Sequence, residues 1–520
     1  MKKKLTLILS ALLLSSTWGC NDDILNIKNQ NQYSDATYFA SDAQFNEAVI
    51  ASYSTLLHNG LYAREWYFTF DLLGNDGERN TPLLGDLAEI PIYSYTGSNP
   101  VIQQTWQSLY RLIFRTNLVL DKANAWQPTL TTEQANKKQY IAEASFLKGW
   151  AQFQLTALWG RVPLRVDYNS SKTFQAPRAS IADGWAAVER DLTKAAADLP
   201  LTYADASAGR VTRGAAIALL GKALLYQKKY AQAQSQFEQL LKAPFTYELA
   251  AKYDDLFTAN TATKEAIFTV QHKWDGWANG NAYYMFGGQE TWGGKSTVTG
   301  RGMEYGWNDW QNVLVSPSLV SAFKYKDEAG KDYTDPRAKL VFYGDAASGG
   351  DTEYCDKCAN GKLPYPFKEK GFYGWRKYQN YEIRKNEEAP YSEINTQIIR
   401  LGDVKLMLAE ALIEQNNVAG ALTQLNDVRK RVGAFAYVAL GDQAAARTIL
   451  RRERQLEMAG EQSRFFDLVR WGIAEPTLNP EKQKQLNRTP FQAKHVLLPI
   501  PRGERDTNPV LNADVKDDWN

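Results

Sequence analysis

The chain has 520 residues, of which 60 are Lys or Arg and 58 are Asp or Glu, so its formal net charge at pH 7 is only +2. This balance lacks the basic excess that would argue for nucleic-acid binding. A chain of this length can bury a large core and could hold two or three domains, while three cysteines are too few to hold such a fold together.

The first 19 residues have the composition of a secretory signal peptide. Three lysines at positions 2–4 precede an apolar run over residues 5–14, which is too short to span a bilayer. Small residues then lead to Cys20, and this pattern predicts cleavage and lipidation of that thiol. Ordinary secretion with an unmodified Cys20 is the alternative. No other stretch approaches the roughly 18 apolar residues of a spanning helix, so we expect residues 20–41 to form a lipidated tether.

Helical periodicity dominates residues 42–262 and returns after residue 396. One predicted helix follows the i, i+3, i+4, i+7 spacing closely, with apolar positions Ala216, Leu219, Leu220, Ala223 and Leu224. A short break at 227–229 separates it from a second helix, and such pairs are typical of tetratricopeptide repeats. Each pair leaves an apolar face that only a neighbouring pair can bury. We predict a mostly α-helical fold, with a repeat scaffold over 42–262 that continues in the C-terminal part, 396–520.

Residues 263–395 interrupt the repeats. Residues 264–271 alternate like a β-strand, and the stretch that follows is rich in Gly, Trp, Tyr and Asn with little helical period. A long irregular insertion in a compact protein usually carries function. We therefore expect an inserted, loop-rich lobe that binds the ligand.

Catalytic signatures are incomplete along the whole chain. Residues 293–296 resemble the end of a P-loop, but Gln289 stands where its first glycine is required. Neither HExxH nor GxSxG occurs, and the three histidines, His58, His272 and His495, are scattered. These features predict a protein that is not an enzyme and that needs no metal or cofactor.

Cys355 and Cys358 form a CxxC motif in the predicted lobe. No second CxxC completes a four-ligand zinc site, and a redox motif would be expected beside a βαβ pattern that the sequence lacks. We expect a small disulfide that staples a loop, with half of a metal site and a redox pair as the alternatives.

Aromatic residues concentrate at 271–310 among Gly, Asn and Gln, where a core segment would pair them with Leu and Val. Sugar rings have apolar C–H faces that stack on indole and phenol rings, while their hydroxyls need polar partners. We expect about half of these rings to pack the lobe and others to form an exposed platform. The candidate ligand-binding residues are Trp274, Trp277, Tyr283, Tyr284, Trp292, Trp307 and Trp310.

A second cluster in the first half of the chain combines aromatic and polar residues. The aromatic run 66–70 is followed by Asn75, Asp76 and Arg79, which are the candidate polar partners of a sugar. Their loops follow early repeat elements, so we expect them to reach the same face as the inserted lobe.

Several segments together resemble the SusD/RagB family. Residues 452–472 (RERQLEMAGEQSRFFDLVRWG) are similar to the motif E-R-x-x-E-L-A-x-E-x-x-R-x-x-D-L-x-R-W-G, with Gln462 at a position where Gly is usual. Residues 497–508 (LLPIPRGERDTN) resemble L-L-P-I-P-x-x-E-x-x-x-N. Further similar segments are 141–164, 209–212 (GRVT) and 400–431.

This resemblance implies a helical fold with four tetratricopeptide-like pairs and an irregular ligand-binding lobe. It also implies a lipoprotein of the outer membrane that faces the cell exterior. Such a protein would capture oligosaccharides for a SusC-like TonB-dependent transporter and act as its extracellular lid.

Charges alternate in sign through the segment 452–470. This density predicts ion-pair networks that tie the last repeat helix to the scaffold, a structural role. The residues are Arg452, Glu453, Arg454, Glu457, Glu461, Arg464, Asp467 and Arg470.

Two other classes of function stay open from the sequence. A peptide-binding uptake protein is possible because tetratricopeptide grooves often hold peptides. A glycoside hydrolase would need two carboxylates beside the scissile bond. The candidates for that role, which form no recognisable motif, are Asp275, Glu290, Glu304 and Asp309.

Overall fold

The structure is a computed structural model that describes residues 38–520 apart from 81–84, 174, 205–206, 259–260, 273–298, 308–309, 356–360, 367–371, 380–391, 483–488, 515–518 and 520. It divides into two compact units, residues 1–45 and 46–520. In the first unit, the described residues reach into helix α3 (Asp42–Ser54), where the Gln44 side chain accepts hydrogen bonds from the backbone N–H groups of Ala40 and Ser41.

The second unit is mainly helical, as predicted. Its N-terminal helices are α4 (Glu65–Leu73), α5 (Pro100–Ala125), α6 (Thr131–Trp159), α7 (Tyr168–Ser171), α8 (Ile181–Asp198), α9 (Arg213–Tyr226) and α10 (Tyr230–Gln239). Its C-terminal helices are α14 (Leu401–Glu414), α15 (Val418–Arg431), α16 (Gln443–Glu457), α17 (Arg464–Arg470), α18 (Ala474–Lys482) and α19 (Arg502–Thr507).

Local sequence explains where these helices begin and end. Helix α5 starts at Pro100, and the side chain of Asn99 accepts hydrogen bonds from the next two free backbone N–H groups. Thr212, the last residue of the GRVT segment, caps α9 in the same way. Helix α6 ends at Gly160, whose φ of +65° lies in the left-handed region that glycine favours.

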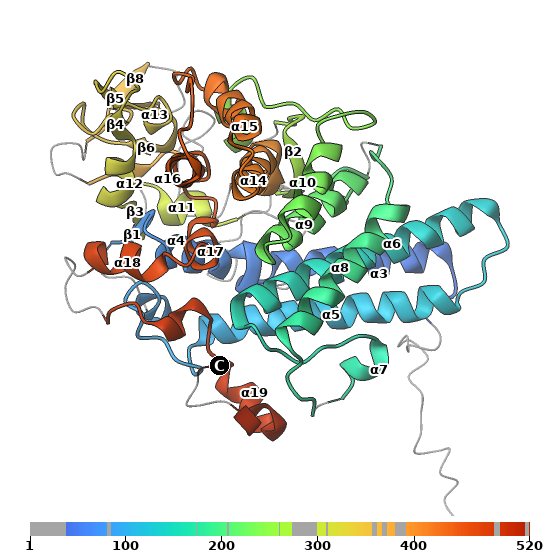
Figure 1. Ribbon diagram of the computed structural model, residues 1–520. Helices are drawn as coiled ribbons and strands as arrows, with labels where there is room; N and C mark the ends of the chain where they lie inside the picture. The colour runs from blue at the N-terminus through green and yellow to red at the C-terminus, as the bar shows by residue number, and fades with distance from the viewer. Residues whose placement is uncertain are drawn as a thin grey trace, which may run out of the picture. The chain divides into compact units, whose positions relative to one another are not determined.

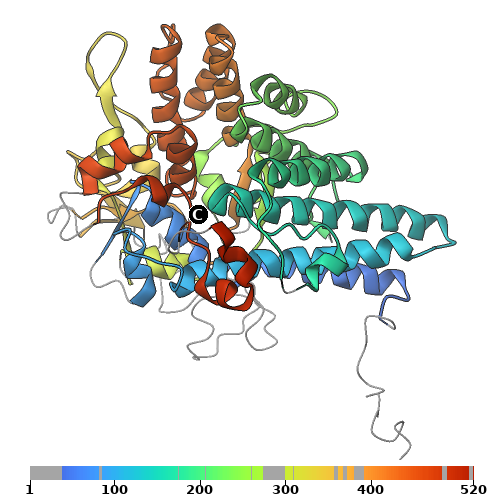
Figure 2. The same ribbon diagram turned by 60° about the horizontal axis from the view of Figure 1, so that its bottom comes forward.

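Successive helices pack into one layered scaffold. Figures 1 and 2 both show α5 and α6 side by side as the two longest helices, and α8 packs on α6 and α9 on α8. Helix α10 then packs against α14, although the inserted lobe separates the two in sequence. The C-terminal helices α14, α15 and α16 thus continue the layers begun by the N-terminal ones.

Helix α9 lies in the middle of this scaffold and is buried on almost every side. Leu220 is 8% exposed, and Ala216 and Ala223 are fully buried. A side chain at Gly221 would meet the ring of Phe237 on α10 at 2.5 Å, so the two helices approach as closely as they do only because position 221 has no side chain. The sequence pattern predicted one buried face here, and packing from several directions buries the rest.

The inserted lobe begins and ends on two paired strands. Strand β2 (Ala266–Val270) confirms the predicted strand and pairs antiparallel with β10 (Thr396–Arg400), with Val270 opposite Thr396. The lobe holds the short helices α11 (Arg301–Tyr305), α12 (Pro317–Ala322) and α13 (Ala338–Val341). Its strands are β3 (Val313–Val315), β4 (Lys324–Lys326), β5 (Asp332–Thr334), β6 (Phe342–Tyr343), β7 (Glu353–Cys355), β8 (Lys362–Pro364) and β9 (Gly374–Trp375).

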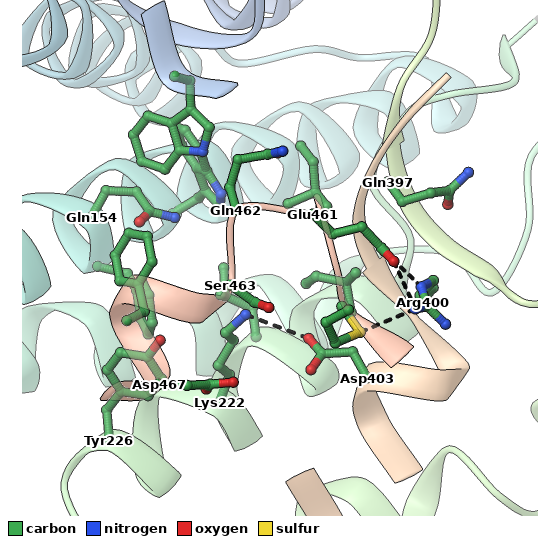
Figure 3. Close-up of a pocket in the computed structure, with 18 of the residues that line it drawn as sticks. Gln154, Lys222, Tyr226, Gln397, Arg400, Asp403, Glu461, Gln462, Ser463 and Asp467 are labelled. Atoms are coloured by element: carbon green, nitrogen blue, oxygen red, sulfur yellow. Dashed lines mark hydrogen bonds and ion pairs between the residues drawn. The ribbon is translucent and has the colours of Figure 1, made fainter. Parts of the chain in front are cut away.

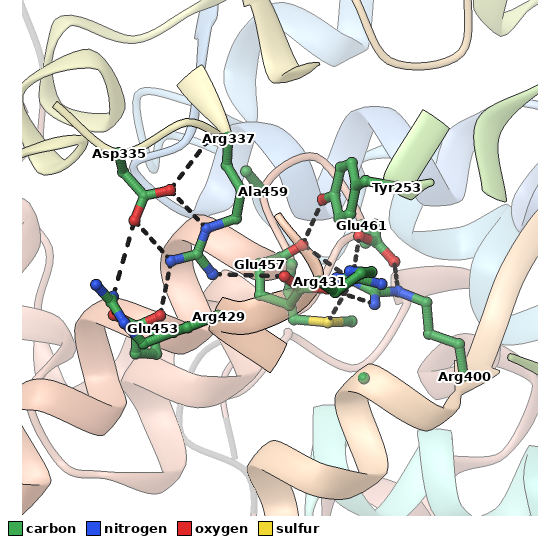
Figure 4. Close-up of polar contacts among 12 residues, drawn as sticks. Tyr253, Asp335, Arg337, Arg400, Arg429, Arg431, Glu453, Glu457, Ala459 and Glu461 are labelled. Carbon is green, nitrogen blue, oxygen red and sulfur yellow. Dashed lines mark hydrogen bonds and ion pairs between the residues drawn. The ribbon is translucent and has the colours of Figure 1, made fainter. Parts of the chain in front are cut away.

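A buried charge network joins the lobe to the scaffold (Figure 4). The carboxylate of Glu457, at the end of α16, forms ion pairs with three arginines. They are Arg400 of β10 at 2.7 Å, Arg337 of the lobe at 3.4 Å, and Arg431 of α15. The network balances, because its cations are Arg337, Lys377, Arg400, Arg429 and Arg431 and its carboxylates are Glu265, Asp335, Glu453, Glu457 and Glu461. These side chains are 3% exposed or less.

The predicted structural role of the charged 452–470 segment is therefore confirmed. A second group of pairs fixes α16 to α14 and α17, with Arg454 bonded to Asp403 at 2.9 Å and to Asp467 at 2.8 Å. Burial alone would raise the pKa of Asp403, but Lys222 and Arg454 outweigh it and lower that pKa to about 2. Charges in such pairs stabilise the fold only as complete sets, because a lone buried charge is costly.

Candidate functional site

The two halves of the candidate ligand site meet at a small sheet. Strand β1 (Gly77–Arg79) pairs antiparallel with β3 of the inserted lobe, with Arg79 opposite Val313. The pairing continues where the backbone N–H of Asn80 donates to the carbonyl of Asn312 at 3.0 Å. Figure 1 shows β1 and β3 side by side beneath the lobe. The structure thus brings the polar segment 75–80 next to residues 310–316, which lie more than 200 positions later in the sequence.

Asn75 and Asp76 point into the protein. Their exposed fractions are 4% and 2%. The Asn75 side chain accepts a hydrogen bond from Nε of Arg464 at 2.8 Å and donates one to Ser318 Oγ at 3.0 Å, while Gln455 donates to Asp76 at 2.9 Å. In this structure both side chains brace the loop between α4 and β1, and their contact with a ligand stays a prediction.

Arg79 and Trp310 are both partly exposed and lie at the same end of the β1–β3 pair. With Asn80, which is also partly exposed, they form what we term the rim surface. The neighbouring Gln311 has a φ of +46°, a conformation that side chains other than glycine rarely adopt. Such strain clusters at functional loops and here shapes the segment that carries Trp310.

Trp307 packs inside the lobe. It is 7% exposed, and its ring meets Tyr354 and Tyr365 edge-on, with centroids 4.5 Å and 5.5 Å away. Tyr343 stacks on Tyr365 and completes this small cluster. The other aromatic candidates lie outside the described residues: Trp274, Trp277, Tyr283, Tyr284 and Trp292.

Helix α11 anchors the segment that leads to the rim surface. Arg301 donates to Asp71 of α4 at 3.0 Å, and its guanidinium lies 3.7 Å from the ring centroid of Tyr378. The hydroxyl of Tyr305 donates to the same carboxylate at 3.0 Å. Because Asp71 belongs to the scaffold, these contacts hold the start of the 305–313 segment in place.

Glu304, one of the carboxylates considered for glycoside hydrolysis, has a structural position. Its side chain is fully buried, binds Nε of Arg64 at 2.6 Å and accepts a hydrogen bond from Asn312 at 2.6 Å. The other three candidates, Asp275, Glu290 and Asp309, lie outside the described residues.

Gln462 is a structural residue whose role the sequence analysis did not assign. Its φ of +56° explains why the resembled motif has Gly at this position. The backbone N–H of Gln462 donates to Asp71 at 3.2 Å, and its amide nitrogen donates to the same carboxylate at 3.2 Å and to the carbonyl of Gly460 at 3.0 Å. The only signal in the sequence was the departure from the motif.

The described residues include neither a metal-binding cluster nor a membrane-spanning helix. Among them, no group of three or more His, Cys, Asp or Glu residues could hold a metal ion. None of the described helices is long and apolar enough to cross a bilayer. Cys355 ends β7, and its side chain, like Cys358 and Cys20, lies outside what the structure describes, so the disulfide and the lipid stay predictions.

Comparison with known proteins finds one family over most of the chain. Residues 264–515 match the SusD family model, and residues 31–225 match a SusD-like model described as starch-binding and associating with the outer membrane. A SusD-like protein of Formosa agariphila is 25% identical over 97% of both chains. A SusD-like protein of Bacteroides ovatus is 25% identical over 91% of this chain and 83% of its own.

Solved structures with the same fold agree. A SusD superfamily protein from Bacteroides vulgatus is 26% identical, with a TM-score of 0.76 over 91% of this chain and 99% of its own. A laminarin-binding SusD-like protein has a TM-score of 0.69 at 24% identity, over 90% and 97% of the two chains. At that identity the likeness shows the fold alone.

Proposed function

We propose, starting from the fact that this chain belongs to the SusD family, that it captures oligosaccharides at the cell surface and passes them to a SusC-like TonB-dependent transporter. The chain is an outer-membrane-associated binding protein of that family and not an enzyme. The finer parts of the proposal are the identity of the site, the lipid anchor at Cys20 and the transporter.

The observation that carries the proposal is the pairing of β1 with β3. It places Arg79 and Asn80 on one side and Trp310 on the other, all partly exposed. An indole offers an apolar face to the C–H side of a sugar ring, while a guanidinium and an amide exchange hydrogen bonds with its hydroxyls. The rim surface therefore combines the two chemistries that sugar recognition needs.

Affinity for a glycan should be modest. Hydroxyl groups exchange water for protein partners with little net gain, and an oligosaccharide loses conformational freedom when it binds. We expect dissociation constants in the micromolar range or weaker, dominated by a few aromatic contacts. This level of affinity suits a protein that must release its cargo to a transporter.

The rim surface is tested with Trp310→Ala and the matched control Trp307→Ala, using calorimetry against a panel of oligosaccharides and short peptides. Removing a platform Trp should weaken binding by about 1–3 kcal/mol, roughly five- to 150-fold, without lowering the melting temperature. Trp307→Ala should instead lower the melting temperature, because Trp307 packs against Tyr354 and Tyr365. Unchanged binding by Trp310→Ala would move the site elsewhere, and peptides that bind in place of glycans would change the ligand class.

The transporter is tested by mild-detergent purification from native membranes. A lid must bury a large surface on its barrel, so a SusC-like protein should co-purify with this chain. Recovery of no transporter of that class would count against delivery and leave glycan binding standing.

A further inference from the structure

A cavity of about 290 Å³ lies beside strand β2. Three segments of the second unit line it, and we term it the β2 cavity: residues between 50 and 57, residues 207–210 and residues 268–271. Its volume is near the roughly 300 Å³ at which ligand-binding pockets begin. Ile50 lines the cavity and is 48% exposed, so the cavity is open to solvent and a ligand can reach it.

The β2 cavity follows an edge of the strand and not one of its faces. Side chains of a strand alternate between the two faces, so a cavity on one face would be lined by every second residue. Here four consecutive residues line it, namely Phe268, Thr269, Val270 and Gln271. Strand β10 pairs with β2 along one edge, and among the described residues β2 has no second partner strand. The cavity therefore lies along the edge of β2 that has no neighbouring strand.

The backbone groups at this edge are available to a ligand. Within the described part of the chain, the backbone N–H and C=O groups of residues 268–271 form no hydrogen bond outside the pair with β10. An antiparallel partner on one side uses only the groups of alternate residues. The remaining groups point to the free edge, where an extended peptide can pair with them as an added strand.

The side chains around the β2 cavity are suited to an uncharged, aliphatic peptide. Among the described residues that line it, only Arg210 carries a charge, and an ion pair with Glu143 at 3.0 Å already compensates that charge. An apolar side chain gains free energy when it leaves water for an aliphatic surface, whereas a second charge would lose its hydration. The aliphatic lining residues are Ile50, Leu56, Leu57 and Val270.

A smaller cavity of about 60 Å³ within the helical scaffold has the opposite character (Figure 3). Its charged side chains bond to one another, for example Lys222 to Asp403 at 3.4 Å, and such compensated pairs leave little for a ligand to bind. In the β2 cavity the polar side chains are available. Over the described residues, the side chains of Ser207, Thr269 and Gln271 form no hydrogen bond, so they can bond to a peptide backbone.

We infer that the β2 cavity binds a short, uncharged peptide, which adds to the free edge of β2 as an extended strand and places an aliphatic side chain in the cavity. At about 3.3 Å per residue, residues 268–271 offer an edge of about 13 Å, which matches a peptide of about four residues. The site gives the protein a second class of ligand. It is independent of the proposed glycan function, because none of the lining residues belongs to the rim surface.

Calorimetry on the full chain tests this inference with a blocked tetrapeptide of alternating Leu and Ser. The wild type should bind it, and the same peptide with N-methylated backbone amides should not bind, because it has lost the N–H groups that pair with a strand edge. Ile50→Lys should weaken binding about fivefold or more, because it brings an ammonium group to the aliphatic lining. Ile181→Lys is the matched control, since Ile181 is also a helical residue, is 46% exposed and does not line the cavity.

Hydrogen exchange read by mass spectrometry locates the bound peptide. Backbone amides of residues 266–271 should exchange more slowly in the complex, because strand addition protects them. The inference is overturned if the peptide does not bind, if the N-methylated peptide binds equally well, if Ile50→Lys binds as Ile181→Lys does, or if exchange at β2 is unchanged. Trp310→Ala separates the two proposals: retained peptide binding supports a separate site at β2, whereas lost peptide binding places the peptide on the rim surface and rejects the β2 site.

Discussion

Glu457→Gln should destabilise the protein strongly while barely changing the shape of the side chain. The carboxylate of Glu457 is fully buried and forms ion pairs with three guanidinium groups, those of Arg337, Arg400 and Arg431. An amide in its place leaves the network with one uncompensated positive charge. Breaking a buried ion pair from one side typically costs about 3–5 kcal/mol.

The surrounding contacts place the expected value near the lower end of that range. Arg431 keeps Glu265 at 2.8 Å, Arg400 keeps Glu265 and Glu461, and Arg337 keeps Asp335 at 2.8 Å. We therefore expect a loss of about 3 kcal/mol. For a cooperative unit of this size the entropy of unfolding is about 1 kcal/mol per kelvin, so the melting temperature should fall by about 3 °C.

Scanning calorimetry and urea titration measure this loss, with Glu414→Gln as the matched control. Glu414 binds Arg447 at 2.7 Å in a pair whose side chains are 19% and 35% exposed. Screened pairs of this kind contribute less than about 1 kcal/mol. If Glu457→Gln melts within 1 °C of Glu414→Gln, the buried network does not stabilise the junction between lobe and scaffold.

Three further predictions concern the helical scaffold, the loss of stability at acidic pH and the lipid anchor. Leu220→Asp places a charge in the middle of the repeat layers and should lower the free energy of unfolding by several kcal/mol. Leu130→Asp, at a position 60% exposed, is the control and should change the free energy of unfolding little. Equal melting temperatures of the two variants would contradict the placement of Leu220 in the core. The folded protein lowers the pKa values of Asp335 and Asp403 from a usual 3.8 to about 2. Each ionised carboxylate should therefore add about 2 kcal/mol to the free energy of unfolding above pH 4, and this contribution should be lost as the pH falls to 2. Urea titrations that give the same free energy of unfolding at pH 5 and pH 2.5 would exclude this linkage. Cys20→Ala should move the protein from the membrane fraction to the soluble fraction, and an unchanged distribution would reject the lipid anchor.

Part of the arrangement of the candidate site could be predicted because it depends on composition. A run of aromatic residues among Gly and Asn, and polar residues after the first helices, marked the segments that the β1–β3 pair brings together. Which aromatic residues of those segments are buried and which are exposed could not be predicted. Trp307 and Trp310 are three positions apart, yet Trp307 packs against Tyr354 and Tyr365 while Trp310 remains partly exposed.

The helical scaffold, the strand within residues 264–271 and the structural role of the 452–470 charges could be predicted from the sequence. Helix periodicity, capping residues and motif spacing act between residues a few positions apart, so they can be read along the chain. The inward orientation of Asn75 and Asp76, and the hydrogen bonds from Gln462 to Asp71, emerge from the folded structure alone. These outcomes depend on side chains more than 200 positions apart, such as Asn75 and Ser318, and on how much space their packing leaves. Burial and cavity shape are properties of the assembled core, because every neighbouring element contributes to them.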